Sequence, residues 1–596
     1  MSQKPMQMLN SFLYNDFKQK LRFGFVGGIN TVSAYLAFIA LYHFSGRYIV
    51  SSILSYLVGM LISYALNRSF VFKSEKKSGQ FVPFCLVNLT SLGCSTAVLY
   101  WLVQYGGFVV YFAQVLAIGV SMVVNYLGYQ KVFTQGVSMR GLLPFLFTQN
   151  ACLDYPQLAK WGGFGLLLIA TLYNVQMSVL SDIAHDALPY MGGYTDKFVS
   201  EGRWINFALF HSLKSVPSYV AVIICNLSIF YFGYRLSLGI RKDVWLALCF
   251  GLLVINVPYF TMLFKWPMTL IPGCLMLALF AYMKEKFNPS ALLIVSGILL
   301  FATYPAFYFL MPLLFLSTLR HASYPSIIKF LLMWALGYVL GYVVANSLVY
   351  AYTYVISEHA SFIHFANWRR STPSTSLSSL LDNVLKSAGN FERNALYISA
   401  LSPWFYLPIA MTVVWAVKQH LKYTLIVALV VLSIYASVVP LGVTVPLRSG
   451  ITLPIGLAVM LLLIEQKVWR GLVLLLLFIP LSYQMHDYND GYTQSRQAMA
   501  SIMESNDTFG YLKQPEQFDK VFVSVDEPKM SQYMYQLTKS NAFNVPSNLR
   551  YHFIKPYLYK HGWPKDKIEV INDPRTAIQG QATIQPEGKT LFIRID

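Results

Sequence analysis

The sequence predicts an all-α polytopic membrane protein of about 15 transmembrane helices, with a small α/β domain at its C-terminal end. Two observations carry this prediction. Of the 596 residues, 56% are hydrophobic and only 12% are charged, which is too much apolar surface for a soluble chain of this length. The apolar residues also gather into runs of roughly 17–25, long enough to cross a bilayer as helices, until the composition turns polar near residue 486.

Charge and cysteine content limit the function classes. The net charge of +19 would favour nucleic-acid binding in a soluble protein. Here the Lys and Arg residues mostly lie in short loops between apolar runs, as the positive-inside rule expects, so no nucleic-acid partner is predicted. The six cysteines have no spacing typical of metal ligands. The mixed segment before the first apolar run does not fit a cleaved signal peptide and predicts a cytoplasmic N-terminus.

Residues 1–135 contain four predicted spans, near 22–44, 48–72, 81–104 and 107–130. Basic residues precede the first span and follow the second and the fourth: Lys18, Lys20, Arg22, Arg68, Lys73, Lys76, Lys77, Lys131 and Arg140. The loop after the first span and the loop after the third carry only Arg47 between them. The positive-inside rule therefore puts both ends of this block in the cytoplasm.

The first block contains an internal repeat of one hairpin. Phe23 precedes Asn30 by seven residues, and Phe81 precedes Asn88 by the same interval. The second span ends in NRSFVF (67–72) and the fourth in GYQKVF (128–133). Because each copy has two spans, the copies keep the same orientation, as parallel repeats do. The polar residues of the repeat could contact a substrate or serve only helix packing.

The pattern FGFVGGINTVSAYLAF with NRSFVF resembles the GtrA-like family of small four-span proteins, over most of residues 20–135. The resemblance implies that this block moves polyprenyl-phosphate-linked sugars across the bilayer or assists proteins that use them. It also leaves open that the block pairs with a second copy of the chain. The positions that match the family pattern are Asn30, Asn67, Arg68 and Asn125.

Residues 136–160 form a predicted cytoplasmic linker, and apolar runs return in residues 161–485. Basic clusters mark the cytoplasmic ends of about eleven further spans, each near membrane length except one pair. That pair flanks Tyr304 and Pro305 and is half as long, which predicts a hairpin reaching partway into the bilayer. With Lys160 inside, this count places the residues after the first of these spans, and residues 486–596, on the exoplasmic side.

The stretch SDIAHDALPY, residues 181–190, is the first candidate site because it brings acids to the mouth of a span. Asp182 and Asp186 are four residues apart, so on a continuing helix both carboxylates would lie on one face. Acids near an apolar boundary are costly and tend to have a function. Solvation of an outer loop is the alternative, and which aspartate would act as a base stays open.

A second candidate group lies in TDKFVSEGRWINFAL, residues 195–209. Glu201 and Arg203 precede an amphipathic run that suits a helix lying in the membrane interface. These two side chains could belong to a binding site or could simply pair with each other.

Arginines on the outer side are candidates for holding a lipid phosphate, because the forked guanidinium donors suit phosphate oxygens. Arg369 and Arg370 lie in the long outer loop 357–394, and Arg448 lies in VPLRSG at the outer end of a later span. Solvation or contact with anionic lipid is the alternative for the pair.

Acids just past a span, a pair of half-length spans, arginines on the outer side and a polar exoplasmic segment together resemble the C-class membrane glycosyltransferase architecture (GT-C). The run of acids, then GRW and an apolar helix, with the Tyr304 turn and VPLR, is similar to GtrII-type glucosyltransferases over residues 160–500. The resemblance implies a bacterial inner-membrane enzyme that transfers a hexose such as glucose from polyprenyl phosphate to a surface polysaccharide such as O-antigen. In that scheme an aspartate removes the proton of the attacking hydroxyl, the arginines stabilise the departing phosphate, and Glu201 and Tyr304 help bind the donor.

Other motifs are missing from the sequence. The chain contains no DxD pair, Walker A loop or GxGxxG, so a cytoplasmic nucleotide donor is not expected. The scheme needs no cofactor or metal, and a divalent ion stays open. A lipid-linked sugar transporter without transferase chemistry is the main alternative, and it would keep its ionisable residues near mid-membrane. An assembly factor is the third, and it would tolerate loss of the outer acids and arginines.

The polar segment 486–596 predicts a small exoplasmic α/β domain. Three β-rich runs, VFVSV (521–525), KIEVI (567–571) and TLFIRID (590–596), predict strands, and residues 495–503 and 529–539 have helical patterns. Such a domain could cap the active site or hold the acceptor glycan.

Overall fold

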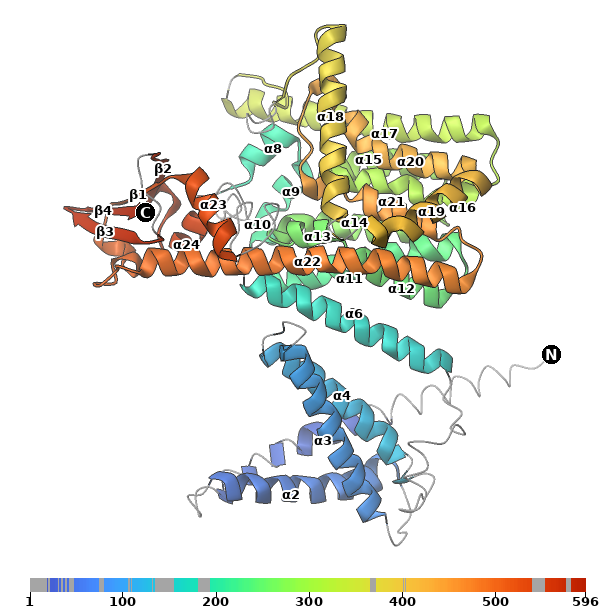
Figure 1. The fold of residues 1–596 in the computed structure, drawn as a ribbon, viewed down its shortest axis with the longest axis vertical. Helices are drawn as coiled ribbons and strands as arrows, with labels where there is room; N and C mark the ends of the chain where they lie inside the picture. The colour runs from blue at the N-terminus through green and yellow to red at the C-terminus, as the bar shows by residue number, and fades with distance from the viewer. Residues whose placement is uncertain are drawn as a thin grey trace. The chain divides into compact units, whose positions relative to one another are not determined.

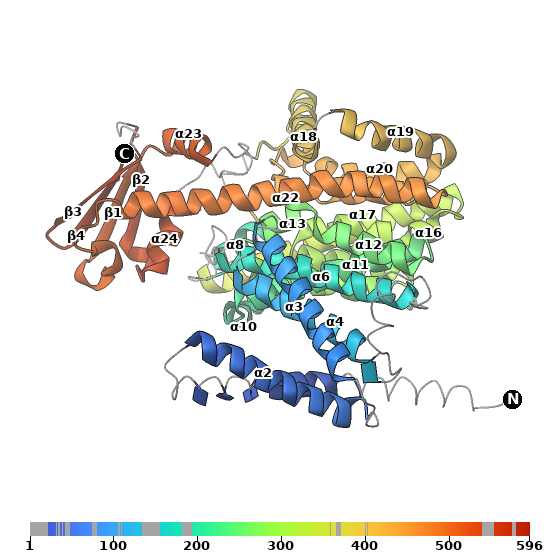
Figure 2. The same ribbon diagram turned by 60° about the horizontal axis from the view of Figure 1, so that its bottom comes forward.

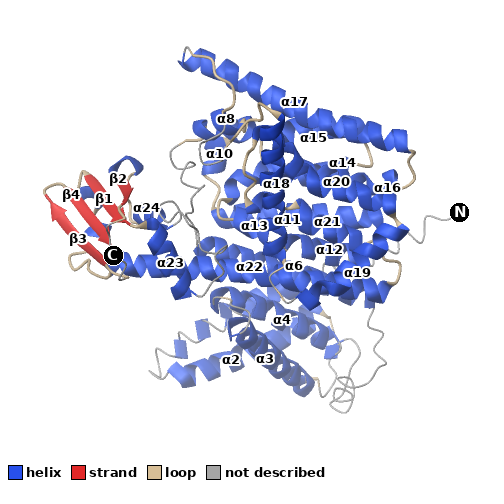
Figure 3. Cartoon of the chain, turned by 45° about the horizontal axis from the view of Figure 1, so that its top comes forward, coloured by secondary structure: helices blue, strands red, loops and turns tan. Residues whose placement is uncertain are grey.

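The computed structural model describes residues 22–30, 48–73, 80–104, 110–130, 155–180, 193–357, 359–364, 371–399, 403–538, 553–574 and 580–596, with a few single residues between them. The chain forms two compact units, Met1–Leu158 and Ala159–Asp596. Helices make up most of both units, and the described strands all lie near the C-terminal end (Figure 3). The predicted helical character of the membrane part is confirmed.

Aromatic residues form the core of the first unit. Its helical residues 22–30 are followed by α2 (Tyr48–Leu66), the π-helical turn η1 (Asn67–Val71), α3 (Phe81–Gln104) and α4 (Val110–Gln130). Phe84 stacks on Tyr129 with the ring centroids 4.5 Å apart, and Phe72 stacks on Phe133 at 5.6 Å. Because Phe72 and Phe133 close the two repeated hairpins, these contacts join corresponding ends of the repeat.

The second unit is a bundle of helices with one helix set across it. Its longer helices are α6 (Tyr155–Leu180), α11 (Ser218–Ile240), α12 (Val244–Ile255), α14 (Ile271–Met283), α15 (Pro289–Phe301), α17 (Tyr324–Ser357), α18 (Leu377–Ile398), α19 (Pro403–Gln419), α20 (Leu421–Ser437), α21 (Thr452–Leu461) and α22 (Lys467–Glu504). Figure 1 shows α18 crossing α17, α15 and α20 at a steep angle.

Within the described residues, five helices are long and apolar enough to cross a membrane: Phe81–Gln104, Ser218–Ile240, Tyr324–Ile356, Leu421–Leu441 and Lys467–Glu504. These helices indicate a membrane protein.

Two helix pairs of the second unit are short. The predicted hairpin at Tyr304 has a 13-residue arm, α15, and returns as the 3₁₀ helix η4 (Pro305–Phe315). Thirteen residues of α-helix extend about 20 Å, less than the hydrocarbon core of about 30 Å. The second pair, α12 and α14, has 12 and 13 residues, where the sequence predicts spans of membrane length. Asn256 ends α12, and α13 (Pro258–Leu263) starts in a new direction at its proline.

Small residues let α15 and α17 approach closely. Gly337 and Gly341 of α17 have GxxxG spacing, which favours tight helix contact in membranes. A Cβ on Gly297 of α15 would lie 2.3 Å from the carbonyl oxygen of Gly337. The hydroxyl of Tyr308, on η4, donates to the carbonyl of Trp334 at 2.6 Å. These contacts fix α15, η4 and α17 as one wall of the bundle.

A four-stranded sheet lies beyond the end of α22 (Figures 1 and 2). Its strands are β1 (Lys520–Val525), β2 (Ile568–Asn572), β3 (Ala582–Glu587) and β4 (Thr590–Ile595), in the order β2-β1-β4-β3. Strand β1 pairs in parallel with β2 and β4, and β3 is antiparallel to β4. Helices α23 (Glu527–Thr538) and α24 (Lys555–Lys560) accompany the sheet. Three strands and α23 lie where the sequence predicts strands and a helix.

The helix α22 links the bundle to this domain. It runs for 38 residues without a break, so it passes residue 486, where the composition turns polar, and includes the helical pattern predicted at 495–503.

Candidate functional site

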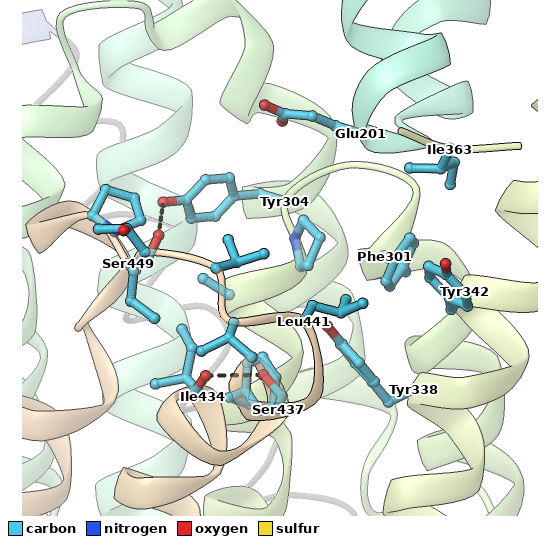
Figure 4. A pocket seen from close by; sticks show the side chains of 18 of the residues that line it. Glu201, Phe301, Tyr304, Tyr338, Tyr342, Ile363, Ile434, Ser437, Leu441 and Ser449 are labelled. Carbon is cyan, nitrogen blue, oxygen red and sulfur yellow. Dashed lines mark hydrogen bonds between the residues drawn. The ribbon is translucent and has the colours of Figure 1, made fainter. Parts of the chain in front are cut away.

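A cavity of about 320 Å³ opens where three segments of the second unit meet (Figure 4). These segments are the turn after α8 (Thr195–Glu201), the tip of the α15–η4 hairpin, and the loop between α20 and α21. The wall is mostly apolar and aromatic, with Phe301, Phe309, Tyr338, Tyr342, Ile434 and Leu441. In Figure 4, Glu201 lies at one end of the cavity and Ile434 with Ser437 at the other. The cavity therefore joins a charged end to an apolar one.

Glu201 and Arg203 form an ion pair at the charged end. Arg203 Nη2 lies 2.5 Å from Glu201 Oε2, and Lys197 Nζ lies 3.4 Å from Glu201 Oε1. The side chains of Glu201 and Arg203 are only 9% and 12% exposed. The predicted pairing of these two residues is therefore observed. Both residues also line the cavity, and their role in binding stays a prediction.

Gly202 sets the direction of this pair. Its φ of +70° is in the left-handed region that favours glycine, and it ends α8 before α9 (Trp204–Ala208) begins. The interfacial run predicted at residues 204–210 is divided at Leu209 into α9 and α10 (Phe210–Lys214) instead of forming one continuous helix.

Tyr304 connects the hairpin tip to the α20–α21 loop. Its hydroxyl lies 3.3 Å from Ser449 Oγ and 3.5 Å from the carbonyl oxygen of Arg448. The guanidinium carbon of Arg203 lies 5.5 Å from the centroid of the Tyr304 ring. The guanidinium of Arg448 lies over Trp266, 4.8 Å from its ring centroid. Of the predicted binding residues, Glu201, Arg203 and Tyr304 thus line the cavity, and Arg448 adjoins it.

Asn206 holds two of the three segments in place. This fully buried side chain on α9 has its Nδ2 3.0 Å from the carbonyl oxygen of Thr269 and 3.4 Å from that of Thr303. It also lies 3.1 Å from the hydroxyl of Tyr194. Asn206 therefore ties α9 to the tips of both short hairpins. Sequence reasoning missed it, although one amide inside the apolar run WINFALF is costly to bury without partners and could have been noticed.

The third segment is held by α18. The loop contains η6 (Val439–Leu441) and η7 (Leu447–Ser449). Lys386 Nζ donates to the carbonyl of Gly442, and Arg393 Nη2 donates to the carbonyl of Val445 at 2.6 Å. The long outer loop predicted at 357–394 thus contains most of a helix, whose basic side chains fix the backbone of the cavity wall.

A buried lysine, which the sequence analysis did not select, lies beside the site. Lys265 is 4% exposed and sits in the turn between α13 and the 3₁₀ helix η3 (Pro267–Leu270). Its Nζ lies 3.2 Å from Asn489 Oδ1 and 4.5 Å from the centroid of the Tyr492 ring. Because Asn489 and Tyr492 belong to α22, this contact joins the turn under Arg448 to the helix that leads to the C-terminal domain.

In the first unit the two hairpin copies differ at one polar position. In the second copy the hydroxyl of Tyr129 donates to Asn88 Oδ1 at 2.8 Å. Arg68 occupies the matching place in the first copy, and its guanidinium carbon lies 5.8 Å from the centroid of the Tyr64 ring. The second copy therefore has a tyrosine that hydrogen-bonds to an asparagine of the same copy, whereas the first copy has a charged arginine at the matching position.

The other residues selected in the first unit are asparagines. Asn67 Nδ2 donates to the carbonyl of Ser63 at 2.9 Å, and Asn125 Nδ2 lies 3.4 Å from Ser121 Oγ. The Oδ1 atoms of Asn30, Asn67 and Asn125 are buried and accept no hydrogen bond from any described residue. A buried amide oxygen without a donor is costly, so these three positions suit a ligand that brings donors.

Four predicted residues, Asp182, Asp186, Arg369 and Arg370, lie outside the described residues. Their roles stay predictions. In the part of the chain that the structure describes, no three His, Cys, Asp or Glu side chains gather as metal ligands would.

Comparison with known proteins identifies one region. Residues 22–134 match the family model described as GtrA/DPMS, transmembrane domain, which confirms the GtrA-like character of the first block. No curated protein and no solved structure matches the chain.

Proposed function

We propose that the chain is a membrane glycosyltransferase that transfers a sugar, such as glucose, from a polyprenyl-phosphate carrier to a surface polysaccharide. In this proposal the first unit flips or delivers the lipid-linked donor, and the second unit uses it on the exoplasmic face of the bacterial inner membrane. One protein thus supplies its own substrate.

The cavity of the second unit carries this proposal. A polyprenyl-phosphate sugar is amphipathic, with an apolar chain, an anionic phosphate and a hydroxyl-rich ring. The apolar and aromatic wall, which includes Phe301 and Leu441, suits the first prenyl units. Arg203 and the hydroxyls of Tyr304 and Ser449 suit the oxygens of the phosphate and the sugar.

The reaction is a displacement at the anomeric carbon. The acceptor hydroxyl attacks that carbon, the bond from carbon to phosphate oxygen breaks, and polyprenyl phosphate leaves as an anion. Asp182 or Asp186 takes the hydroxyl proton as general base. Arg203, Arg448 and the pair Arg369–Arg370 are the candidates that stabilise the charge on the phosphate. Glu201 holds Arg203 in position through the 2.5 Å ion pair.

Translocation alone is the second candidate function, because the family match is confined to residues 22–134. In that case the first unit moves the lipid-linked sugar and the second unit only binds it. Asn30, Asn67, Arg68 and Asn125 are then the residues to test, since a sugar would bring hydroxyl donors to the buried amide oxygens.

Mass analysis of surface glycans separates these candidates. Strains would carry the intact protein, Asp182→Asn, Asp186→Asn, Arg203→Gln or no protein, with membrane levels matched. Asp196→Asn is the control, because Asp196 lies exposed on α8. We expect a sugar increment with the intact protein and the control, lost with Arg203→Gln and at least one of Asp182→Asn and Asp186→Asn. An increment that survives all three substitutions removes these residues from the mechanism, and no increment in any strain favours translocation.

A further inference from the structure

A second pocket lies at the other end of the second unit's bundle. It has a volume of about 130 Å³ and is lined by Arg241, Ser317, Arg320, His321, His420 and Tyr423. These residues come from the end of α11, from α16 (Leu316–Leu319) and the turn after it, and from the start of α20. Figures 1 and 3 place α16 at the end of the bundle away from α8, so this pocket is separate from the 320 Å³ cavity.

Two basic side chains, of which Arg241 also lines the pocket, hold its walls in place. Lys422 Nζ, on α20, donates to the carbonyl of Ala322 and holds the turn after α16. Arg241 donates through Nε and Nη2 to the carbonyls of Leu462 and Leu463, at 3.0 and 2.7 Å, and thereby caps α21. The turn after α16 and the end of α21 are therefore held before any ligand arrives.

Three other side chains that line the pocket lack such partners. The side chains of Arg320, His321 and His420 make no hydrogen bond or ion pair with any described residue. Other cations at this end do: Arg470 Nη1 donates to the carbonyl of Ile464 at 2.8 Å, and Arg235 pairs with Glu285 at 2.9 Å. The lining therefore keeps guanidinium and imidazole donors that the protein does not use.

Among the described residues, no carboxylate lines this pocket. The hollow next to it, which shares Arg241, also has Lys242, Lys467 and Arg470, but Asp243 and Glu465 line it and offset their charge. Burial and the neighbouring charge of Arg320 lower the pKa of His420, and the charge of Glu465 acts in the opposite direction. Tyr423, which also lines the pocket, is buried at 4% exposure.

We propose that this pocket binds a phosphate group. Arg320 presents a forked donor set to two phosphate oxygens, and the hydroxyls of Ser317 and Tyr423 and the imidazoles add single donors. A volume of about 130 Å³ is large enough for one small anion. The phosphate belongs either to an anionic lipid head group or to free inorganic phosphate, and this site is independent of the proposed transferase.

Binding to the full chain tests the proposal. The thermal unfolding midpoint of detergent-purified protein would be measured against inorganic phosphate, with chloride at equal ionic strength as reference. Native mass spectrometry of the protein from nanodiscs containing phosphatidic acid, or phosphatidylcholine alone, would show retained lipid. Arg320→Gln is the test variant, and Lys329→Gln on α17 is the control, since Lys329 is an exposed cation outside the pocket.

We expect the intact protein and Lys329→Gln to bind phosphate or phosphatidic acid, and Arg320→Gln to bind at least roughly ten-fold more weakly, as loss of a charge-assisted hydrogen bond implies. Stabilisation by inorganic phosphate identifies free phosphate as sufficient, and retention of phosphatidic acid alone identifies the lipid head group. If Arg320→Gln fails to fold, Arg320→Lys, which keeps the charge without the fork, should show intermediate binding. No binding of either ligand to the intact protein, or equal loss in the Arg320 and Lys329 variants, would overturn the proposal.

Discussion

Gly202→Ala tests the site without changing any group that touches a ligand. Alanine in the left-handed region costs roughly 1–2 kcal/mol, and Gly202 has a φ of +70°. The added Cβ would lie 2.6 Å from Ile363 Cδ1 and 2.8 Å from Ala345 Cβ. The end of Ile363 can turn away, but Ala345 is fixed on α17, so overpacking of about 1–3 kcal/mol adds to the backbone cost. The sum is about 2–5 kcal/mol of lost stability.

Gly510→Ala is the matched control for that variant. Gly510 has a φ of +69°, nearly the same, but its nearest neighbour is Gln514 Nε2 at 3.6 Å, an ordinary contact. Only the backbone cost should appear there. Thermal unfolding of the full chain, together with the glycan assay, should show Gly202→Ala less stable than Gly510→Ala and alone impaired in sugar transfer. Equal unfolding midpoints for the Gly202→Ala and Gly510→Ala variants would contradict the close contact between Gly202 and Ala345 of α17.

Three further perturbations follow from single contacts. Tyr129→Phe removes the 2.8 Å donor of the half-buried Asn88 Oδ1, so the full chain should unfold with about 0.5–1.5 kcal/mol less stability in a denaturant titration. Arg393→Gln removes the 2.6 Å bond to the Val445 carbonyl, so proteolysis of the α20–α21 loop should speed up; an unchanged cleavage rate would contradict its bracing role. Burial and Lys513 lower the pKa of His561, so its stabilising contribution is present above about pH 6.5 and is lost as pH falls through the folded-state pKa. Limited proteolysis from pH 8 to about pH 5 should show this loss, and His561→Gln should flatten the profile.

Much of the C-terminal domain was predictable from local pattern, and its one missed strand has a physical reason. The strands β1, β2 and β4 alternate buried and exposed residues with β-branched side chains, the usual signal of a half-buried strand. Strand β3, ATIQPE, has mostly exposed residues after its first and contains Pro586. Pro586 is tolerated because β3 lies at the edge of the sheet, where a proline does not remove a hydrogen bond between central strands.

The two short hairpins show a limit of counting apolar runs. Tyr304 and Pro305 signal a break because both flanking runs are short, whereas α12 and α13 together form one apolar run of ordinary span length. Asn256 and Pro258 interrupt that run in space but hardly change its composition. Hydrophobicity therefore predicts which residues enter the membrane better than where the helix turns.

The candidate site was only partly predictable for a similar reason. Glu201, Arg203 and Tyr304 stand out as polar groups beside apolar runs, and the structure brings them together. The apolar wall does not stand out, since Phe301 and Ile434 differ in nothing local from ordinary core residues. Asn206 and Arg393 act through backbone carbonyls far away in sequence, at Thr303 and Val445, which no local pattern shows.

These distant bonds bear on how the site would work. Each of the three segments that meet at the cavity is held in place by a different residue or pair of residues. Asn206 bonds to the backbone of the hairpin tip, and Arg393 and Lys386 bond to the backbone of the α20–α21 loop. Gly202 fixes the turn after Glu201. None of the first three side chains lines the cavity. Groups fixed in this way lose little freedom when substrate binds, so more of the binding energy can act on the transition state. Loss of a lining group such as Tyr304 should then weaken binding of the donor, whereas loss of Asn206 or Arg393 should mainly slow transfer from donor that is already bound.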